Sequence, residues 1–322
     1  MNEIGGYLSL ELAPQNKWFL HQNCIMLNSG HNALEYILLN IKTPIHTIYI
    51  PYYTCDSILI PIKKLNLHYE FYHINYNFEL CNEIHLGNND YIIVNNYFGI
   101  KDKYIQQLSC LYGSKLIIDS TQAWYAPEIL GLNMFFSPRK FFGLPDGGAA
   151  LCNSEPISIE LEQDHSYDRF SHLLKRIDSN ANEGYSDFKN LSILLREEPI
   201  KFMSNLTYSI LSQIDFDNVA TRRRSNYEIL EQSLSQTNLI KLPHKNTFAC
   251  PLGYPYFTKN TSLRKHLIDN KVFVPIYWPN VTIWTNPKSV EYNLAQNLLM
   301  LPIDQRYDID DMNSIIQLIQ NK

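Results

Sequence analysis

The 322-residue sequence lacks the features of a membrane, secreted or nucleic-acid-binding protein. No stretch of 18 apolar residues occurs, and the opening segment MNEIGGYLSLEL has no charged region followed by an apolar one. We therefore expect a cytoplasmic protein that does not span a membrane. The net charge is −5, and the basic residues are scattered apart from Arg222, Arg223 and Arg224. This distribution argues against a nucleic-acid partner.

The cysteines show no pattern of a disulfide framework or a metal site. They occur singly, without a Cys-x-x-Cys pair or a Cys/His cluster at zinc-finger spacing, so we expect free thiols and no metal. Low-complexity tracts and internal repeats are also absent. What the chain does have is 45% hydrophobic residues, enough for a buried core in one large domain or two. The cysteines are Cys24, Cys55, Cys81, Cys110, Cys152 and Cys250.

The first half of the chain alternates short β-branched runs with helical patterns. This alternation is typical of strands joined by crossover helices into a mostly parallel sheet. A first helix is predicted directly after Asn28–Gly30, and more polar helices between 155 and 235. After 236 the pattern changes to that of a small α+β unit, so we predict a large domain at 1–235 and a small C-terminal domain at 236–322. The predicted strands are 46–51, 68–74, 90–96, 114–120, 134–137 and 148–153.

Polar residues follow several of these strands, at the ends where open α/β sheets bind ligands. The run KLIID ends in Asp119, and Gln122 follows three residues later. A carboxylate at the end of an apolar strand costs energy to desolvate unless it meets a cation. The plain alternative is an aspartate that caps the next turn.

The start of the first predicted helix is a candidate anion site. Asn28, Ser29 and Gly30 precede backbone N–H groups that have no helical partner, and the positive end of the helix dipole favours an anion such as phosphate. Ser137, at the end of the strand 134–137, offers a second hydroxyl. An ordinary helix cap and an ordinary turn serine are the alternatives.

Lys140 stands between Arg139 and two phenylalanines, Phe141 and Phe142, ahead of an Asp-Gly-Gly turn. A lysine amine is a useful nucleophile only when its pKa falls, and both apolar walls and a neighbouring cation lower it. A solvated loop lysine is the alternative. Lys140 follows Asp119 by 21 residues, however, with the candidate anion site upstream. This order fits a pyridoxal phosphate pocket, which needs an amine for the aldehyde, a counter-ion for the pyridinium and a phosphate cup.

In this order the motifs resemble those of fold-type I pyridoxal-phosphate enzymes, in particular the DegT/StrS-type nucleotide-sugar aminotransferase family. NSGHNALEYIL is similar to the family's phosphate segment, Ser-Gly-Thr-x-Ala-Leu, and YIPYYTCDSI to its Val-Pro-x-x-Thr-aromatic segment. IIDSTQAWYA resembles Glu-Asp-x-x-Gln-Ala-His-Gly, and SPRKFFGLPDGG the lysine segment. The resemblance implies an α/β fold, a mostly parallel mixed sheet flanked by helices, with a smaller C-terminal α+β domain.

The resemblance also implies roles for residues at the motif positions. Lys140 would hold the cofactor through a Schiff base and then move the substrate proton. Asp119 would pair with the pyridinium nitrogen, and Gln122 would lie near the ring's phenolic oxygen. The phosphate would be bound by Ser29, Gly30, His31 and Ser137.

The chain departs from the family pattern near the cofactor. His31 replaces a threonine, and it could simply cap the helix. Trp124 replaces a histidine, and Phe135 stands where the family has a serine. Cys55 falls where the family has an aromatic ring stacked on the cofactor; Tyr53 or Tyr97 could take that place, unless they are core residues.

Substrate recognition is the least transferable part of the resemblance. Trp278 and Arg306 are candidates for gripping an anionic or sugar group, unless they pack or lie on the surface. The family implies a homodimer, and Tyr185 lies in the candidate crossing loop. The implied function is transfer of an amino group from an amino acid, with glutamate expected, to a nucleotide-linked keto-sugar in surface polysaccharide biosynthesis. The alternative is a pyridoxal-phosphate-binding protein with another reaction or a regulatory, non-transaminating role; the dehydratase branch has histidine in place of Lys140.

Overall fold

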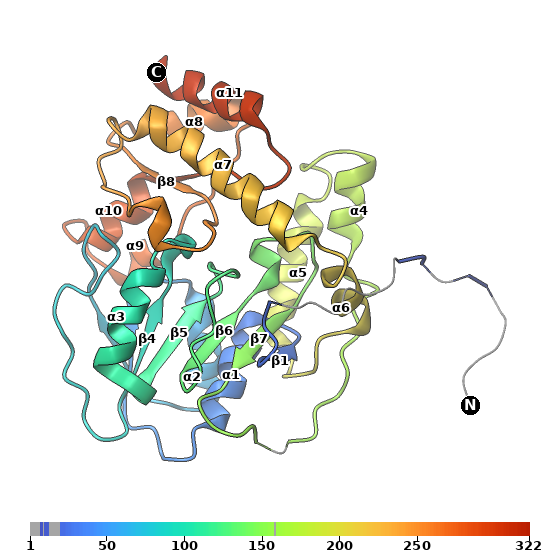
Figure 1. Cartoon of the computed structure of the whole chain (residues 1–322), viewed down its shortest axis with the longest axis vertical. Helices are drawn as coiled ribbons and strands as arrows, with labels where there is room; N and C mark the ends of the chain where they lie inside the picture. The colour runs from blue at the N-terminus through green and yellow to red at the C-terminus, as the bar shows by residue number, and fades with distance from the viewer. Residues whose placement is uncertain (1–6, 9, 13–19, 158) are drawn as a thin grey trace.

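A seven-stranded mixed sheet dominates the protein, which we describe from a computed structural model that covers residues 7–8, 10–12, 20–157 and 159–322 (Figure 1). The strand order is β1-β7-β6-β5-β4-β2-β3. Only β7 runs antiparallel to its neighbours. The strands are β1 (Ile25–Leu27), β2 (Ile48–Pro51), β3 (Tyr69–Tyr72), β4 (Tyr91–Asn95), β5 (Leu116–Ser120), β6 (Asn133–Phe136) and β7 (Gly148–Leu151).

This topology confirms the predicted fold class, and every predicted strand is present. One further strand, β1, was not predicted from the sequence, because its three residues are too few to show a period. Strands β2 to β6 are parallel, so their carboxyl ends meet at one edge of the sheet. Since β7 runs the opposite way, it begins at that edge, and β1 ends there. Loops from six different parts of the chain therefore converge.

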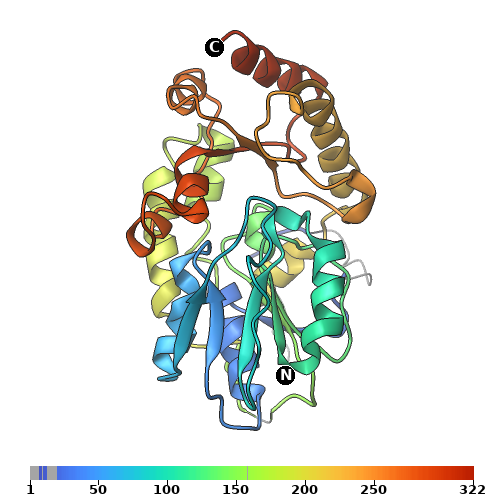
Figure 2. The ribbon, with the colours of Figure 1, turned by 90° about the vertical axis from the view of Figure 1, so that its left-hand side faces the viewer.

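Helices cover both faces of the sheet, because successive strand residues point to opposite sides. Ile117 packs with α1 (Gly30–Asn40) and α2 (Leu59–Lys64) on one face. Its neighbours Leu116 and Ile118 pack on the other face, with α3 (Asp102–Tyr112). Figure 2 shows α3 on one side of the sheet and α1 and α2 on the other.

The second half of the chain is mostly helical and ends in a small α+β unit, as predicted. The unit contains the antiparallel pair β8 (Tyr254–Phe257) and β9 (Leu298–Leu301). The described helices are α4 (Ser171–Asp178), α5 (Tyr185–Glu197), α6 (Asn205–Leu211), α7 (Phe216–Leu234), α8 (Leu263–Asp269), α9 (Val281–Trp284), α10 (Val290–Asn297) and α11 (Ile309–Gln320). Short 3-10 turns lie at Asp56–Ile58, Tyr97–Gly99, Gly113–Lys115, Pro138–Lys140 and Lys245–Thr247. No described helix is long and apolar enough to cross a membrane.

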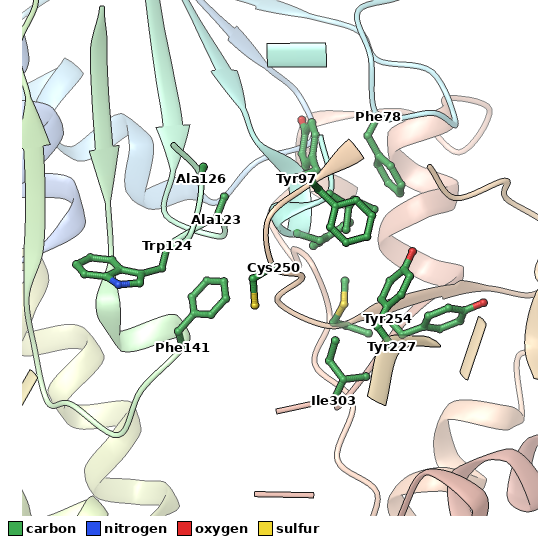
Figure 3. Packing of buried hydrophobic residues seen from close by; sticks show 14 of the residues in the cluster. Phe78, Tyr97, Ala123, Trp124, Ala126, Phe141, Tyr227, Cys250, Tyr254 and Ile303 are labelled. Atoms are coloured by element: carbon green, nitrogen blue, oxygen red, sulfur yellow. The ribbon is translucent and has the colours of Figure 1, made fainter. Parts of the chain in front are cut away.

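One apolar cluster joins the sheet to the C-terminal unit (Figure 3). Trp124 and Phe141 lie on the sheet side of this cluster, Tyr227 and Tyr254 on the other, with Cys250 between them. Helix α7 packs against α11 and β8, so the residues before 236 also contact the C-terminal unit. The division of the chain near 236 remains a prediction.

Candidate active site

The converging loops enclose a cavity of about 330 Å³, within the usual size range of small-molecule sites. It lies at the edge where the parallel strands end, the place where open α/β sheets bind ligands. The structure brings most of the predicted site residues together there. Those that line the cavity are Ser29, Gly30, His31, Cys55, Asp119, Gln122, Ser137, Lys140 and Trp278.

The Asp-Gly-Gly turn explains how the lysine loop and the first helix meet. Gly147 has a φ of +110°, which disfavours a side chain, and its N–H donates to the Asn28 carbonyl at 2.8 Å. A Cβ on Gly148 would lie 2.1 Å from the Ser29 carbonyl oxygen. Both glycines are therefore required for β7 to begin directly beneath the start of α1.

Lys140 ends a single 3-10 turn, Pro138–Lys140, that follows β6. Its side chain is exposed to the cavity, while the loops that crowd around it desolvate the amine in part. This desolvation lowers the pKa of the Lys140 amine; Arg139 lowers it further, whereas Cys55 and Asp119 oppose the change. The lowered pKa favours the nucleophilic, uncharged amine.

Phe141 and Phe142 do not wall the amine as the sequence predicted. Both are buried in the core, where their rings pack against Tyr125, and the ring of Phe142 also packs against Phe216. They anchor the loop from below instead, because two large apolar side chains are most stable away from a polar cavity.

Asp119 is the last but one residue of β5 and is only 8% exposed. Burial raises its pKa to about 6, although hydrogen bonds with Thr121 and the charge of Lys140 act in the opposite direction. One carboxylate oxygen accepts the Thr121 N–H at 2.9 Å, so the turn-capping contact is present as well. A cation in the cavity would offset the cost of the buried charge.

Two amide side chains present polar atoms that have no partner among the residues that the structure describes. Gln122 Oε1 accepts the Phe98 N–H at 3.2 Å, but its Nε2 donor is buried and has no partner. Asn95, at the end of β4, donates to Thr54 Oγ1 at 3.0 Å and leaves its Oδ1 unpaired. Buried polar atoms are nearly always hydrogen-bonded in folded proteins, so these two groups indicate a ligand with polar atoms.

The start of α1 forms a positively charged end of the cavity. Ser29 caps the helix by accepting the Asn32 N–H at 3.2 Å, and its hydroxyl lies 3.2 Å from His31 Nδ1. The pKa of His31 is lowered to about 4. Burial is the largest cause, and the positive charges of Arg196, Lys64 and Arg139 lower the pKa further. The imidazole is therefore neutral at pH 7, and these cations add to the helix dipole.

Four predicted residues do not line the cavity. Tyr53 is fully buried behind it, with its ring 5.2 Å from that of Trp278, and Tyr97 is buried beside it, so both are core residues. Arg306 is paired with Asp304 at 2.7 Å on the surface. Tyr185 begins α5 and is exposed, beneath the Lys189 amine. Its place in a loop that crosses to a partner stays a prediction.

Several lining residues were missed by the sequence analysis. Asn95 follows the strand-end rule that pointed to Asp119 and could have been found by it. Phe188, Ser192 and Arg196 come from α5, which folds back over the cavity from a distant part of the chain. No local motif marks them, because helix α5 has an ordinary amphipathic pattern.

No protein-family model and no curated protein sequence matches the chain. Solved structures do match over most of its length. The sugar aminotransferase CalS13 from Micromonospora echinospora has a TM-score of 0.64 at 14% identity, covering 93% of this chain and 87% of that one. A DegT DnrJ EryC1 StrS aminotransferase from Brucella abortus has a TM-score of 0.60 at 15% identity, covering 92% and 85%.

A third match is NtdA from Bacillus subtilis with bound cofactor PMP, at a TM-score of 0.64 and 15% identity, covering 92% of this chain and 72% of that one. These likenesses confirm, for the fold, the resemblance that the motifs indicated. The chain has the fold of the sugar aminotransferases.

Proposed function

We propose that this protein is a pyridoxal-phosphate-dependent aminotransferase that moves an amino group from an amino acid, with glutamate the expected donor, to a keto-sugar. A nucleotide-linked sugar and a role in surface polysaccharide biosynthesis are parts of the proposal. One observation carries it: Lys140 and Asp119, from separate motifs, line the same cavity as the start of α1. The shared fold and the NtdA complex support it.

The residues of the cavity fit the cofactor group by group. Asp119 provides a buried carboxylate for a pyridinium N–H. A phenolic oxygen would be the acceptor that the Gln122 Nε2 donor lacks among the described residues. Ser137 and the first N–H groups of α1 are available to a phosphate at the positively charged end.

When bound, pyridoxal phosphate supplies an aldehyde that condenses with amines and a ring that accepts the electrons of a broken Cα–H bond. The chain supplies the rest. Lys140 Nζ, with its lowered pKa, would be the nucleophile that holds the cofactor and the base that takes the Cα proton and returns it. Asp119 would keep a proton on the ring nitrogen by electrostatic pairing.

Arg139 is a candidate for the carboxylate of the amino donor. Its guanidinium lines the cavity, and burial lowers its pKa. It forms no salt bridge with any residue that the structure describes, while its Nη2 donates to Ser192 Oγ at 3.5 Å. A half-buried guanidinium without a carboxylate partner suits a bidentate carboxylate, which both candidate donors and acidic sugars carry.

A homodimer is also part of the proposal. Helices α4 and α5 expose apolar side chains beside the cavity, and a second copy of the chain would cover them. Light scattering at micromolar concentration is expected to give twice the monomer mass. The exposed apolar residues of α4 and α5 are Leu174, Ile177, Tyr185, Phe188, Ile193 and Leu194.

The central experiment is reduction of the reconstituted protein with borohydride, followed by peptide mapping. We expect an absorption band in the visible region and a cofactor trapped on Lys140, with no band in Lys140→Ala. Lys64→Ala is the matched control, since Lys64 is close but paired with Glu35 at 2.7 Å. Trapping on another lysine would refute the assignment.

A second measurement distinguishes transamination from the alternative function, which is cofactor binding without transamination. Glutamate, added to the loaded protein, is expected to convert the visible band to that of the aminated cofactor, and a panel of keto-sugar nucleotides to restore it. If no amino acid changes the spectrum, the protein binds the cofactor without transamination. The cytoplasmic location and the lack of a nucleic-acid partner remain predictions.

A further inference from the structure

Three side chains of the types that bind metal ions lie together outside the cavity. His21 and Cys24 precede β1, and Glu128 belongs to the loop between β5 and β6. Their ligand atoms all lie within 4.8 Å of one another. None of the three residues lines the cavity, and the proposed aminotransferase chemistry does not use them.

The tautomer of the neutral His21 ring is fixed by its neighbours. Its Nε2 lies 2.6 Å from the Trp124 carbonyl oxygen, which can only accept, so Nε2 carries the proton. In the neutral ring, Nδ1 then presents a lone pair. This atom is buried, has no hydrogen-bond partner within the described part of the chain and lies 3.7 Å from Glu128 Oε1. A lone pair that faces a carboxylate in a buried site is repelled unless a proton or a metal cation lies between them.

The remaining geometry is that of a prepared site. Cys24 Sγ lies 3.5 Å from Glu128 Oε1, and the other carboxylate oxygen accepts from Asn23 Nδ2 at 2.6 Å. The His21 ring is held between Trp124 and Phe136, with ring centroids 4.6 and 4.0 Å away. Such outer contacts orient metal ligands in known sites, where a ligating histidine commonly donates its other N–H to a carbonyl.

We propose that His21 Nδ1, Cys24 Sγ and Glu128 Oε1 bind a divalent transition-metal ion of the Zn²⁺ class. Tetrahedral Zn²⁺ with its usual bond lengths places neighbouring ligand atoms roughly 3.5 Å apart, which matches the two measured separations. The mixed N, S and O set suits a borderline ion and not Mg²⁺ or Ca²⁺, which prefer oxygen. The fourth position is open to water.

The sequence analysis did not expect a metal, because the site has no local motif. Cys24 and Glu128 are 104 positions apart and meet only through the fold. A bound ion would tie the segment before β1 to the loop that follows Asp119 and Gln122. We therefore expect it to stabilise the protein, whether or not the aminotransferase proposal holds.

The test is Zn²⁺ binding to the full chain after chelation, measured by calorimetry, with Co²⁺ as a spectroscopic probe. We expect one Zn²⁺ per chain, a higher melting temperature, and a near-ultraviolet band from thiolate coordination of Co²⁺. Cys24→Ala should remove the band and weaken Zn²⁺ binding by more than about 100-fold, since loss of an outer contact alone costs roughly 10- to 100-fold. Cys81→Ala, at an exposed thiol, should change neither.

X-ray absorption of the wild-type zinc complex makes the result independent of variant folding. One sulfur and two or three nitrogen or oxygen neighbours would support the site, and a shell without sulfur would overturn it. The proposal also fails if no stoichiometric binding occurs, or if Cys24→Ala and Glu128→Gln both bind Zn²⁺ as the wild type does. Borohydride trapping on Lys140 is a separate measurement, so the two proposals can fail independently.

Discussion

Two buried polar regions lie on either side of the Asp-Gly-Gly turn, and they differ in how their charges are paired. On one side, Arg169 donates to Asp146 at 2.8 Å and to Asp164 at 2.6 Å, and Glu198 lies within 3.4 Å. On the other side, Asp119 and Lys140 line a cavity in which Gln122 keeps an unpaired donor.

The pKa directions record the same contrast. Burial alone would lower the pKa of Arg169, but hydrogen bonds with Asp164 and Asp146 raise it, so the charged form is favoured. In the cavity, burial raises the pKa of Asp119 and lowers that of Lys140, so both charged forms are disfavoured. The first region is complete without a ligand, whereas the second becomes complete only when one binds.

The largest expected effect follows from removing the cavity's amine. Lys140→Ala should slow the glutamate half-reaction by about 10³-fold or more, because the variant lacks the group that moves the Cα proton. Stopped-flow absorbance of the aminated cofactor measures the rate in both proteins after pyridoxal phosphate is added. A small added amine such as methylamine should restore part of it, while the melting temperature should change little. A half-reaction at the wild-type rate would remove Lys140 from the mechanism.

The opposite outcome is expected in the paired region. Arg169→Met leaves Asp146 and Asp164 buried without their cation, and we expect a loss of about 3–5 kcal/mol in the free energy of unfolding. Urea denaturation measures this loss. Lys201→Met is the matched control, because Lys201 lies 3.7 Å from Asp164 and is more exposed, so its removal should cost under about 1 kcal/mol. Equal costs would erase the contrast between the regions.

Asp119 offers a test in which stability and function move in opposite directions. Its carboxyl has a raised pKa of about 6 against 3.8 when unfolded, so its stabilising contribution is present below pH 4 and is lost as the pH rises through 6. In the cofactor-free protein, Asp119→Asn should therefore gain stability relative to the wild type between pH 4.5 and 7.5. The gain is about 2–3 kcal/mol.

The same variant should bind pyridoxal phosphate more weakly and transaminate more slowly at pH 7.5, because the ring nitrogen loses its counter-ion. Paired denaturation and spectral titrations at both pH values measure the two effects. Parallel changes in stability and cofactor binding would show that Asp119 acts only as a turn cap for Thr121.

The fold and the centre of the site were predictable from sequence for different reasons. The composition of strands such as Leu116–Ser120 predicts them directly. The parallel topology then places Asp119 and the Lys140 loop at one edge of the sheet. Features set by tertiary packing were not predictable. The ring of Phe142 turned out to anchor the loop, and Tyr53 to pack behind Trp278, because aromatic residues next to a site in sequence can face the core.

Contacts across large sequence separations lie further beyond local reasoning. Arg196 reaches the cavity from α5, and its neighbour Asp56 stands 140 positions away in the chain. The same applies to Glu128, which meets Cys24 only in the folded protein. No sequence motif marks either pair. The two residues of each pair lie more than 100 positions apart and come together only when the strands assemble into the sheet.

The smallest expected effect concerns Arg196, the cation that α5 adds to the positively charged end of the cavity. Arg196→Ala should weaken pyridoxal phosphate binding by about tenfold, since one partly exposed charge near a phosphate contributes on the order of 1 kcal/mol. Pyridoxal, which lacks the phosphate, should bind both proteins equally. Fluorescence titration with the two compounds measures the difference.

The control must separate the charge of Arg196 from the ion pair that holds it. Asp56 accepts from both guanidinium nitrogens, at 2.6 and 3.0 Å, so Arg196→Ala also frees α5 from the 3-10 turn after Cys55. Asp56→Asn weakens the same pair but keeps the cation, and it should leave phosphate affinity unchanged or higher. If both variants lose affinity alike, the ion pair acts by positioning α5, and the electrostatic role assigned to Arg196 at the cavity is wrong.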